Sequence, residues 1–174
     1  GIILASVILA EAAVVSGHKA VQSQSYGPEA RGGLCKAETI LSREQIWFSK
    51  VIQPEFLLAL TQASLDKYAP DIAPEALVMI DSSLSIPETL SPEQVISVPI
   101  LDTAKKKVGN AVTANIVAVG AINAALGLFD RQSLQEGVRR HIPVGTEDLN
   151  WKALDEGAKL VSPEQAEKYH RDLS

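Results

Sequence analysis

Cysteine is almost absent from this sequence, since Cys35 is the only one among 174 residues. A single thiol excludes an internal disulfide framework. It also excludes an iron–sulfur cluster held by this chain alone, because such clusters need several thiolate ligands. A chain without disulfides is typical of the reducing cytoplasm, and we therefore expect a cytoplasmic protein.

Positive charge is also scarce. The chain carries 16 lysines and arginines against 21 aspartates and glutamates, which gives a net charge of −5. This balance argues against a nucleic-acid-binding protein, which would present a basic stripe to the phosphates. The one dense basic run, Lys105 to Lys107, is interpreted as a solvated surface.

The apolar opening run, residues 2–15, is too short to be read as a membrane span. A spanning helix needs roughly 20 apolar residues, and Glu11 interrupts this run. No basic residues precede it, as they would in a signal peptide. We therefore expect a buried helix here. Because the chain begins with Gly1 and not with methionine, we also expect the natural sequence to start further upstream.

Motifs for independent catalysis are missing as well. His18, His141 and His170 are scattered without the spacing of metal ligands. Ser82 and Ser83 lack the glycine-flanked pattern of a nucleophile elbow. We therefore predict no catalytic residue and no metal ligand in this chain.

The hydrophobic pattern predicts one α/β domain. Hydrophobic residues make up 46% of the chain, which is enough for a single core. Strands are expected at 18–25, 34–42, 56–60, 76–80 and 95–100, and helices at 2–16, 61–68, 102–108, 113–126, 130–141 and 147–161. Short strands that alternate with helices indicate a three-layer α/β/α, Rossmann-like domain with a largely parallel sheet. Because helices gather toward the C-terminus, we expect one or two of them to lie against a neighbouring protein.

Several polar residues match the pattern of helix caps. Residues 91–94 and 162–165 both read Ser-Pro-Glu-Gln, which predicts a serine N-cap followed by proline at the first helical position. Thr113 is expected to cap the helix that follows it, with Asn115 in the first turn. One face of that helix consists of small residues, and it packs either on another subunit or on this domain's own sheet: Ala114, Ala118, Ala121 and Ala125.

Polar residues also follow three of the predicted strands, where ligands of open α/β sheets bind. For Thr61 and Asp81 we favour a role as caps of the next helix or turn. The run 22–25, Gln-Ser-Gln-Ser, differs from the continuously apolar pattern of a strand buried on both faces. It indicates a site or the edge of an interface.

The segment 26–33, Tyr-Gly-Pro-Glu-Ala-Arg-Gly-Gly, directly follows this run. Its glycines permit a tight loop and a close approach of the backbone to a ligand. Exposed N–H groups together with Arg31 form a suitable cradle for a phosphate or a carboxylate. The alternative is a structural turn that contains an internal pair of Glu29 and Arg31.

The block QSYGPEARGG, residues 24–33, resembles the signature loop of the gamma subunits of 2-oxoacid:ferredoxin oxidoreductases, in the pyruvate/ketoisovalerate oxidoreductase gamma family. The resemblance is strongest to the 2-oxoglutarate branch. It continues in family order through PEFLLALTQASLDKY, VMIDSSL, VPILDTAKKKVGNAVTANIVAVGA and VRRHIPVGTEDLNWKALDEG. We therefore expect 1–174 to form a single gamma-type domain. Family members open with a strand and a glycine-rich turn, and Gly1 resembles the last glycine of that turn, so both are expected to precede the present sequence.

The resemblance implies a shared enzyme. Similar enzymes convert a 2-oxoacid and coenzyme A to an acyl-CoA and CO2 and pass electrons to ferredoxin. Thiamine diphosphate, magnesium and iron–sulfur clusters are then expected in partner alpha, beta and ferredoxin-like delta subunits. The sequence agrees, because it has no Gly-Asp-Gly motif for a magnesium–diphosphate site. The gamma domain is expected to be inactive alone and to help form the cavity for coenzyme A and substrate.

The resemblance also implies which residues form the site. Contacts with the anionic coenzyme A are expected from Tyr26, Gly27, Arg31, Gly32 and Gly33, and contacts with the 2-oxoacid from Ser25, Glu29 and Asn115. Two other functions stay open: a free-standing Rossmann-like nucleotide- or flavin-binding enzyme, and a structural adaptor without ligand contacts. Within the family, pyruvate and indolepyruvate are alternative substrates.

Overall fold

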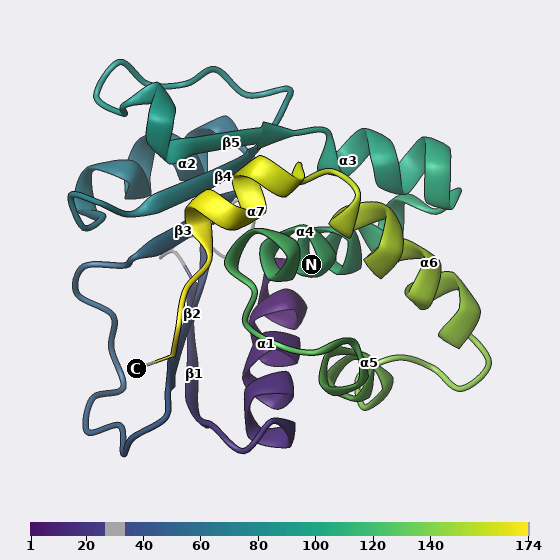
Figure 1. Cartoon of the computed structure of the whole chain (residues 1–174). Helices are drawn as coiled ribbons and strands as arrows, with labels where there is room; N and C mark the ends of the chain where they lie inside the picture. The colour runs from purple at the N-terminus through teal and green to yellow at the C-terminus, as the bar shows by residue number, and fades with distance from the viewer. Residues whose placement is uncertain (27–33, 174) are drawn as a thin grey trace.

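The computed structural model describes residues 1–26 and 34–173. Its helices are α1 (Ile2–Val15), α2 (Gln62–Tyr68), α3 (Ile100–Asp102), α4 (Ala114–Leu126), α5 (Arg131–Arg139), α6 (Glu147–Ala158) and α7 (Pro163–Tyr169). Its strands are β1 (Lys19–Tyr26), β2 (Cys35–Ser42), β3 (Phe56–Ala59), β4 (Leu77–Asp81) and β5 (Val95–Val98). Figure 1 shows a short sheet of β3, β4 and β5 and a long β1–β2 hairpin beside α1.

The strands β3, β4 and β5 form a parallel sheet with β4 in the middle. All five residues of β4 are buried, because its side chains alternate between two hydrophobic cores. Leu77 and Met79 belong to the main core together with residues of α4. Val78 and Ile80 pack instead with Leu65 of α2. Helices therefore cover both faces of this sheet, and the predicted α/β class is confirmed.

The strands β1 and β2 pair antiparallel and form a sheet of their own. The sequence predicted both strands, but the alternation along a strand does not reveal its neighbour or its direction. The helix α1 packs against one face of this hairpin, and the hydroxyl groups of Ser6 and Thr39 are hydrogen-bonded at 2.5 Å. The connection between β2 and β3 lies on the opposite face of the hairpin.

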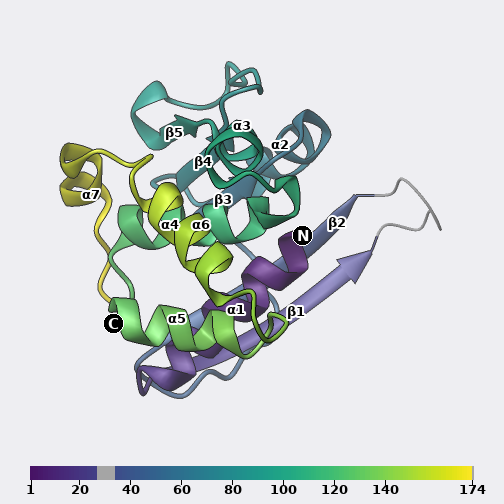
Figure 2. The same ribbon diagram turned by 90° about the vertical axis from the view of Figure 1, so that its right-hand side faces the viewer.

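The helices α4 and α6 lie side by side, as Figures 1 and 2 both show. Gly120 of α4 and Gly157 of α6 permit this approach, since a Cβ at either position would overlap a backbone carbonyl of the other helix. Ala118, Ala121 and Ala125 of α4 are completely buried within the chain. Of the two alternatives for this small-residue face, packing inside the domain is therefore confirmed, with α6 as an additional partner.

Both Ser-Pro-Glu-Gln segments form the predicted capping boxes. The first begins a short 3-10 turn, Pro92–Gln94, that leads into β5, and the second begins α7. The predicted helix at 102–108 is instead a single turn, α3, followed by the π-helical segment Thr103–Val108. Within the described residues, no helix has the length and apolar character needed to cross a membrane.

Candidate functional site

The predicted loop connects the two strands of the hairpin. Tyr26 at the end of β1 pairs with Cys35 at the start of β2, so the two ends of the loop lie next to each other. Five predicted site residues lie outside the described residues: Gly27, Glu29, Arg31, Gly32 and Gly33. The structure nevertheless fixes where this loop begins and ends, and the surroundings of these two points form the candidate site.

A hollow of about 290 Å³ lies at this end of the hairpin. Ser25 pairs with Lys36, and Ser23 pairs with Glu38, so these four side chains share one face of the hairpin. The neighbouring residue Thr39 contacts α1, which places the hollow on the face away from α1. The hollow is lined by hydroxyl, amide and charged side chains from the hairpin and the following connection: Ser23, Gln24, Ser25, Lys36, Glu38, Ser49 and Lys50.

The charges in this hollow are arranged around Glu38. Its carboxylate forms an ion pair with Lys36 at 2.8 Å and accepts a hydrogen bond of 3.1 Å from the backbone N–H of Val51. Burial raises the pKa of Glu38, but the hydrogen bonds from Lys36 and Val51 and the charges of Lys36 and Lys50 outweigh it, so the pKa lies below 4.5. The hydrogen bond to Glu38 in turn raises the pKa of Lys36 above 10.5.

The arrangement suits anion binding better than proton transfer. Two lysines and several hydroxyl groups surround one carboxylate, and this carboxylate is already used by Lys36 and Val51. Ammonium and hydroxyl groups donate hydrogen bonds to phosphates and carboxylates. Ser23, Gln24 and Ser25 of the polar run line this hollow, and the interpretation of the run as a site edge stays a prediction.

Sequence reasoning missed Lys36, Ser49 and Lys50 as candidate site residues. Lys36 could have been found from the sequence. A glycine-containing loop between two alternating segments is a hairpin signal, and in such a hairpin Lys36 pairs with a residue of the polar run. Ser49 and Lys50 could not be found in this way. They come from the β2–β3 connection, which folds back so that the Ser23 hydroxyl donates to the Ser49 carbonyl at 3.3 Å.

Thr61, which follows β3, and Asp81, the last residue of β4, are structural caps, as we had favoured. The carboxylate of buried Asp81 accepts hydrogen bonds from the backbone N–H of Leu101 at 2.9 Å and from the N–H and hydroxyl of Ser83 at 3.0 and 2.6 Å. The hydroxyl of Thr61 accepts a hydrogen bond from Ser64 N–H at the start of α2.

The start of α4 differs in detail from the prediction. Thr113 is the N-cap residue of α4, but its hydroxyl donates to the Asn110 carbonyl at 2.7 Å and forms no side-chain cap hydrogen bond. Asn110 caps the 3-10 turn Ala111–Thr113 that precedes α4, and its side chain accepts a hydrogen bond from Val112 N–H at 3.0 Å. Asn115 is half-buried in the first turn and accepts from Ile116 N–H at 2.9 Å. It does not line the hollow at the hairpin.

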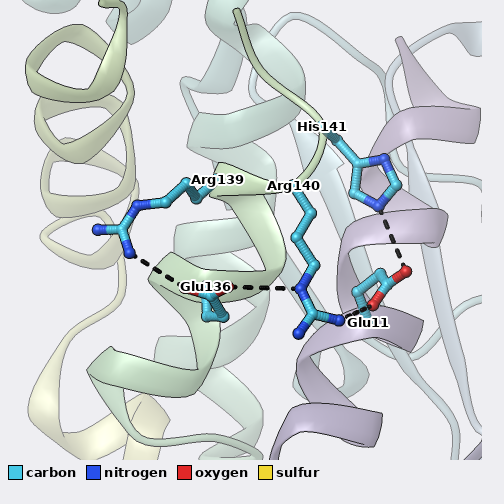
Figure 3. Close-up of polar contacts among 5 residues, drawn as sticks. All are labelled: Glu11, Glu136, Arg139, Arg140 and His141. Atoms are coloured by element: carbon cyan, nitrogen blue, oxygen red, sulfur yellow. Dashed lines mark hydrogen bonds and ion pairs between the residues drawn. The ribbon is translucent and has the colours of Figure 1, made fainter. Parts of the chain in front are cut away.

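A second hollow, of about 660 Å³, lies between the end of α1 and α5. Figure 3 shows the ion pairs of Arg140, one of its lining residues, which lies 2.9 Å from Glu11 of α1 and 3.4 Å from Glu136. His141 Nε2 lies 3.7 Å from the same Glu11. These half-exposed pairs connect α1 with α5, so we interpret them as structural. Within the described residues, no group of three His, Cys, Asp or Glu side chains could hold a metal ion.

Comparison with known proteins gives consistent matches. The family model described as pyruvate ferredoxin/flavodoxin oxidoreductase matches residues 1–160. The 2-oxoglutarate synthase subunit KorC of Methanocaldococcus jannaschii is 39% identical over 164 residues, covering 92% of this chain and 88% of that protein. The gamma subunit of keto/oxoacid ferredoxin oxidoreductase from Geobacter sulfurreducens is structurally similar, with a TM-score of 0.79 at 40% identity over 95% of this chain and 91% of that chain.

One relative is much longer than this chain. The ketoisovalerate oxidoreductase subunit VorA of Methanothermobacter thermautotrophicus is 33% identical over 91% of this chain, but only 34% of that protein is covered. In all these comparisons the similarity extends along most of the present sequence. The chain therefore belongs to the pyruvate ferredoxin/flavodoxin oxidoreductase family, as a domain of the gamma-subunit type.

Proposed function

We propose that this chain serves a 2-oxoacid:ferredoxin oxidoreductase whose substrate is 2-oxoglutarate. The complex would convert the oxoacid and coenzyme A to an acyl-CoA and CO2 and reduce ferredoxin. The observation that carries this proposal is the 39% identity to a 2-oxoglutarate synthase subunit along 92% of the chain. The signature loop at 24–33 supports the same assignment.

The proposal assigns the redox cofactors to partner subunits in a cytoplasmic complex. A chain with one cysteine does not fit an iron–sulfur cluster, because the donor set is too small. Thiamine diphosphate supplies the carbanion chemistry when it is bound, and the clusters carry the electrons. We place thiamine diphosphate, magnesium and the clusters in alpha, beta and ferredoxin-like delta subunits. The residues of the present chain would bind and orient the anionic reactants.

The end of the hairpin is the part of this chain that fits such a role. Lys36 and Lys50 line the hollow at the point where the loop begins and ends. A phosphate of coenzyme A or the carboxylate of the oxoacid is attracted by both ammonium groups. We propose that Arg31 completes this anion site from the loop, assisted by backbone N–H groups of Gly32 and Gly33.

Substitutions in the assembled complex test this role. Arg31→Ala removes a bidentate donor, and we expect the apparent KM for coenzyme A or 2-oxoglutarate to rise about tenfold. Lys50→Ala removes one charge at the rim and should raise it about threefold. The measurement is coenzyme A- and 2-oxoglutarate-dependent reduction of a viologen dye by the purified complex.

The matched control is Lys105→Ala, which removes an exposed lysine outside the hollow and should leave both KM values unchanged. Unchanged KM values for Arg31→Ala and Lys50→Ala in a complex of normal composition would reject the anion site. If Arg31→Ala prevents assembly instead, the loop acts as a structural adaptor. Bound flavin or dinucleotide in the purified chain would favour the free-standing enzyme.

A further inference from the structure

Among the described residues, Glu38 supplies the only carboxylate that lines the hollow at the hairpin end. Its side chain is 14% exposed, whereas that of its partner Lys36 is 34% exposed. The carboxylate is therefore the more buried member of the pair, and the ammonium group lies nearer to solvent. A buried charge needs hydrogen bonds and opposite charges that compensate for its lost hydration. The groups that bind Glu38 are thus held close to it.

The two oxygen atoms of Glu38 bind two different segments of the chain. Oε1 lies 2.8 Å from the ammonium group of Lys36, which belongs to the same strand, β2. Oε2 accepts the hydrogen bond from the backbone N–H of Val51, which belongs to the β2–β3 connection and directly follows Lys50. One side chain therefore holds a lysine of the hairpin and also the backbone next to a second lysine of the hollow.

The ion pair with Glu38 is the main restraint on the ammonium group of Lys36. The ring centre of Tyr68 lies 5.8 Å from the Lys36 Nζ atom, close to the outer limit of about 6 Å for a cation–π contact. A lysine stem is flexible, so such a long contact restrains it only weakly. An ammonium group has three N–H donors. Glu38 therefore fixes the position of Lys36 while it leaves donors for an anion in the hollow.

We propose that Glu38 is a positioning residue of the anion site, whose carboxylate holds Lys36 and the backbone beside Lys50 so that both lysines bind the same anionic reactant. This inference rests on the proposed function. A carboxylate that did nothing else would weaken the site, because it repels an anion. Its benefit is preorganisation: two flexible lysines that are already in place lose less conformational entropy when the anion binds.

The sign of one effect separates positioning from simple charge. Glutamine has the shape of Glu38 but only one acceptor oxygen, so Glu38→Gln keeps either Lys36 or Val51 but not both. In the assembled complex we expect the apparent KM for coenzyme A or 2-oxoglutarate to rise about fivefold, with kcat within about twofold of the wild type. A site that acted through net charge alone would bind anions more tightly without the carboxylate. A lower or unchanged KM therefore overturns the inference.

Three further variants control this measurement. Glu44→Gln removes an exposed carboxylate of the same connection, outside the hollow, and should leave both KM values unchanged. Glu38→Asp keeps the charge on a side chain that is shorter by one methylene group, so its KM should lie between those of wild type and Glu38→Gln. If Glu38→Gln does not assemble, an unchanged KM for Glu38→Asp overturns the inference. In a Lys36→Ala background, Glu38→Gln should raise KM by a smaller factor, and an equal factor contradicts action through Lys36.

The reactivity of Lys36 measures its position without the enzyme reaction. The hydrogen bond to Glu38 raises the pKa of Lys36, so Glu38→Gln should increase the fraction of unprotonated amine. We expect Lys36 to be acetylated by acetic anhydride about threefold faster, relative to exposed Lys105, in mass spectrometry of its peptides. An unchanged relative rate in the variant shows that Glu38 does not hold Lys36, and it overturns the inference.

The activity of the wild-type complex distinguishes the two proposals. A complex that reduces viologen with 2-oxoglutarate and coenzyme A, but whose KM values and Lys36 acetylation do not respond to Glu38→Gln, refutes the positioning role alone. A wild-type complex without oxoacid-dependent reduction refutes the proposed function, and the acetylation rate then decides separately whether Glu38 holds Lys36.

Discussion

At the scale of the residue, Gly157 shows how closely the helices of the core approach. A Cβ at this position would overlap the Val117 carbonyl of α4 and lie 3.1 Å from the Ala121 nitrogen. These are backbone atoms, so α4 and α6 have to separate to accept a methyl group. We expect Gly157→Ala to lower the free energy of unfolding by about 1–3 kcal/mol in urea titrations.

Lys152→Ala is the matched control, since it changes an exposed residue of the same helix. Its effect on the free energy of unfolding should stay within about 0.5 kcal/mol. A Gly157→Ala variant as stable as the wild type would show that α4 and α6 pack more loosely than the structure indicates.

Residues differ in how well the sequence predicts their roles. The capping serines Ser91 and Ser162 were predictable, because the cap and its glutamine partner lie only three residues apart. Thr113 lies at the predicted N-cap position of α4 but forms no side-chain cap hydrogen bond, and the side-chain cap is made by Asn110 at the preceding 3-10 turn. Lys50 was missed because its place in the hollow depends on a connection that folds back over 26 residues of sequence, from Ser49 to Ser23.

At the scale of the element, Glu38 of β2 joins the hairpin to the β2–β3 connection through Val51, and it also forms an ion pair with Lys36 of the same strand. Its pKa is lower in the folded chain than the ordinary 4.5. The stabilisation by Glu38 is therefore complete above pH 4.5 and is lost as the pH falls through the folded-state pKa. We expect wild type to lose more stability than Glu38→Gln between about pH 6 and about pH 3.

Chemical denaturation at several pH values measures this difference. Glu44→Gln is the control, because Glu44 is exposed and its pH dependence should match the wild type. If Glu38→Gln and wild type lose stability in parallel on acidification, the carboxylate does not hold the connection in place.

Most elements were predictable, whereas the pairing of two strands was not. The apolar run at 76–80 predicted a strand, and the structure buries β4 on both faces, with Leu77 and Val78 in different cores. The prediction was a largely parallel sheet without assigned neighbours, and in the structure β1 and β2 form a separate antiparallel hairpin. Long-range partners decide such pairing, and the local pattern does not contain them.

At the scale of the whole molecule, the family membership of this chain and its proposed dependence on partner subunits rest on different observations. The family membership rests on similarity along residues 1–160. The proposed dependence on partners rests on a donor set with a single thiol. The second point belongs to the proposal that this chain shapes a binding site while electron transfer takes place in other subunits.

The most direct measurement of this account compares the purified chain with the complex isolated from the native source. Reduction of a viologen dye is recorded with 2-oxoglutarate and coenzyme A, together with the iron content of each sample. We predict a colourless, inactive single chain and an iron-containing complex that needs both reactants. A single chain that contains iron and oxidises the oxoacid without partners would contradict the account.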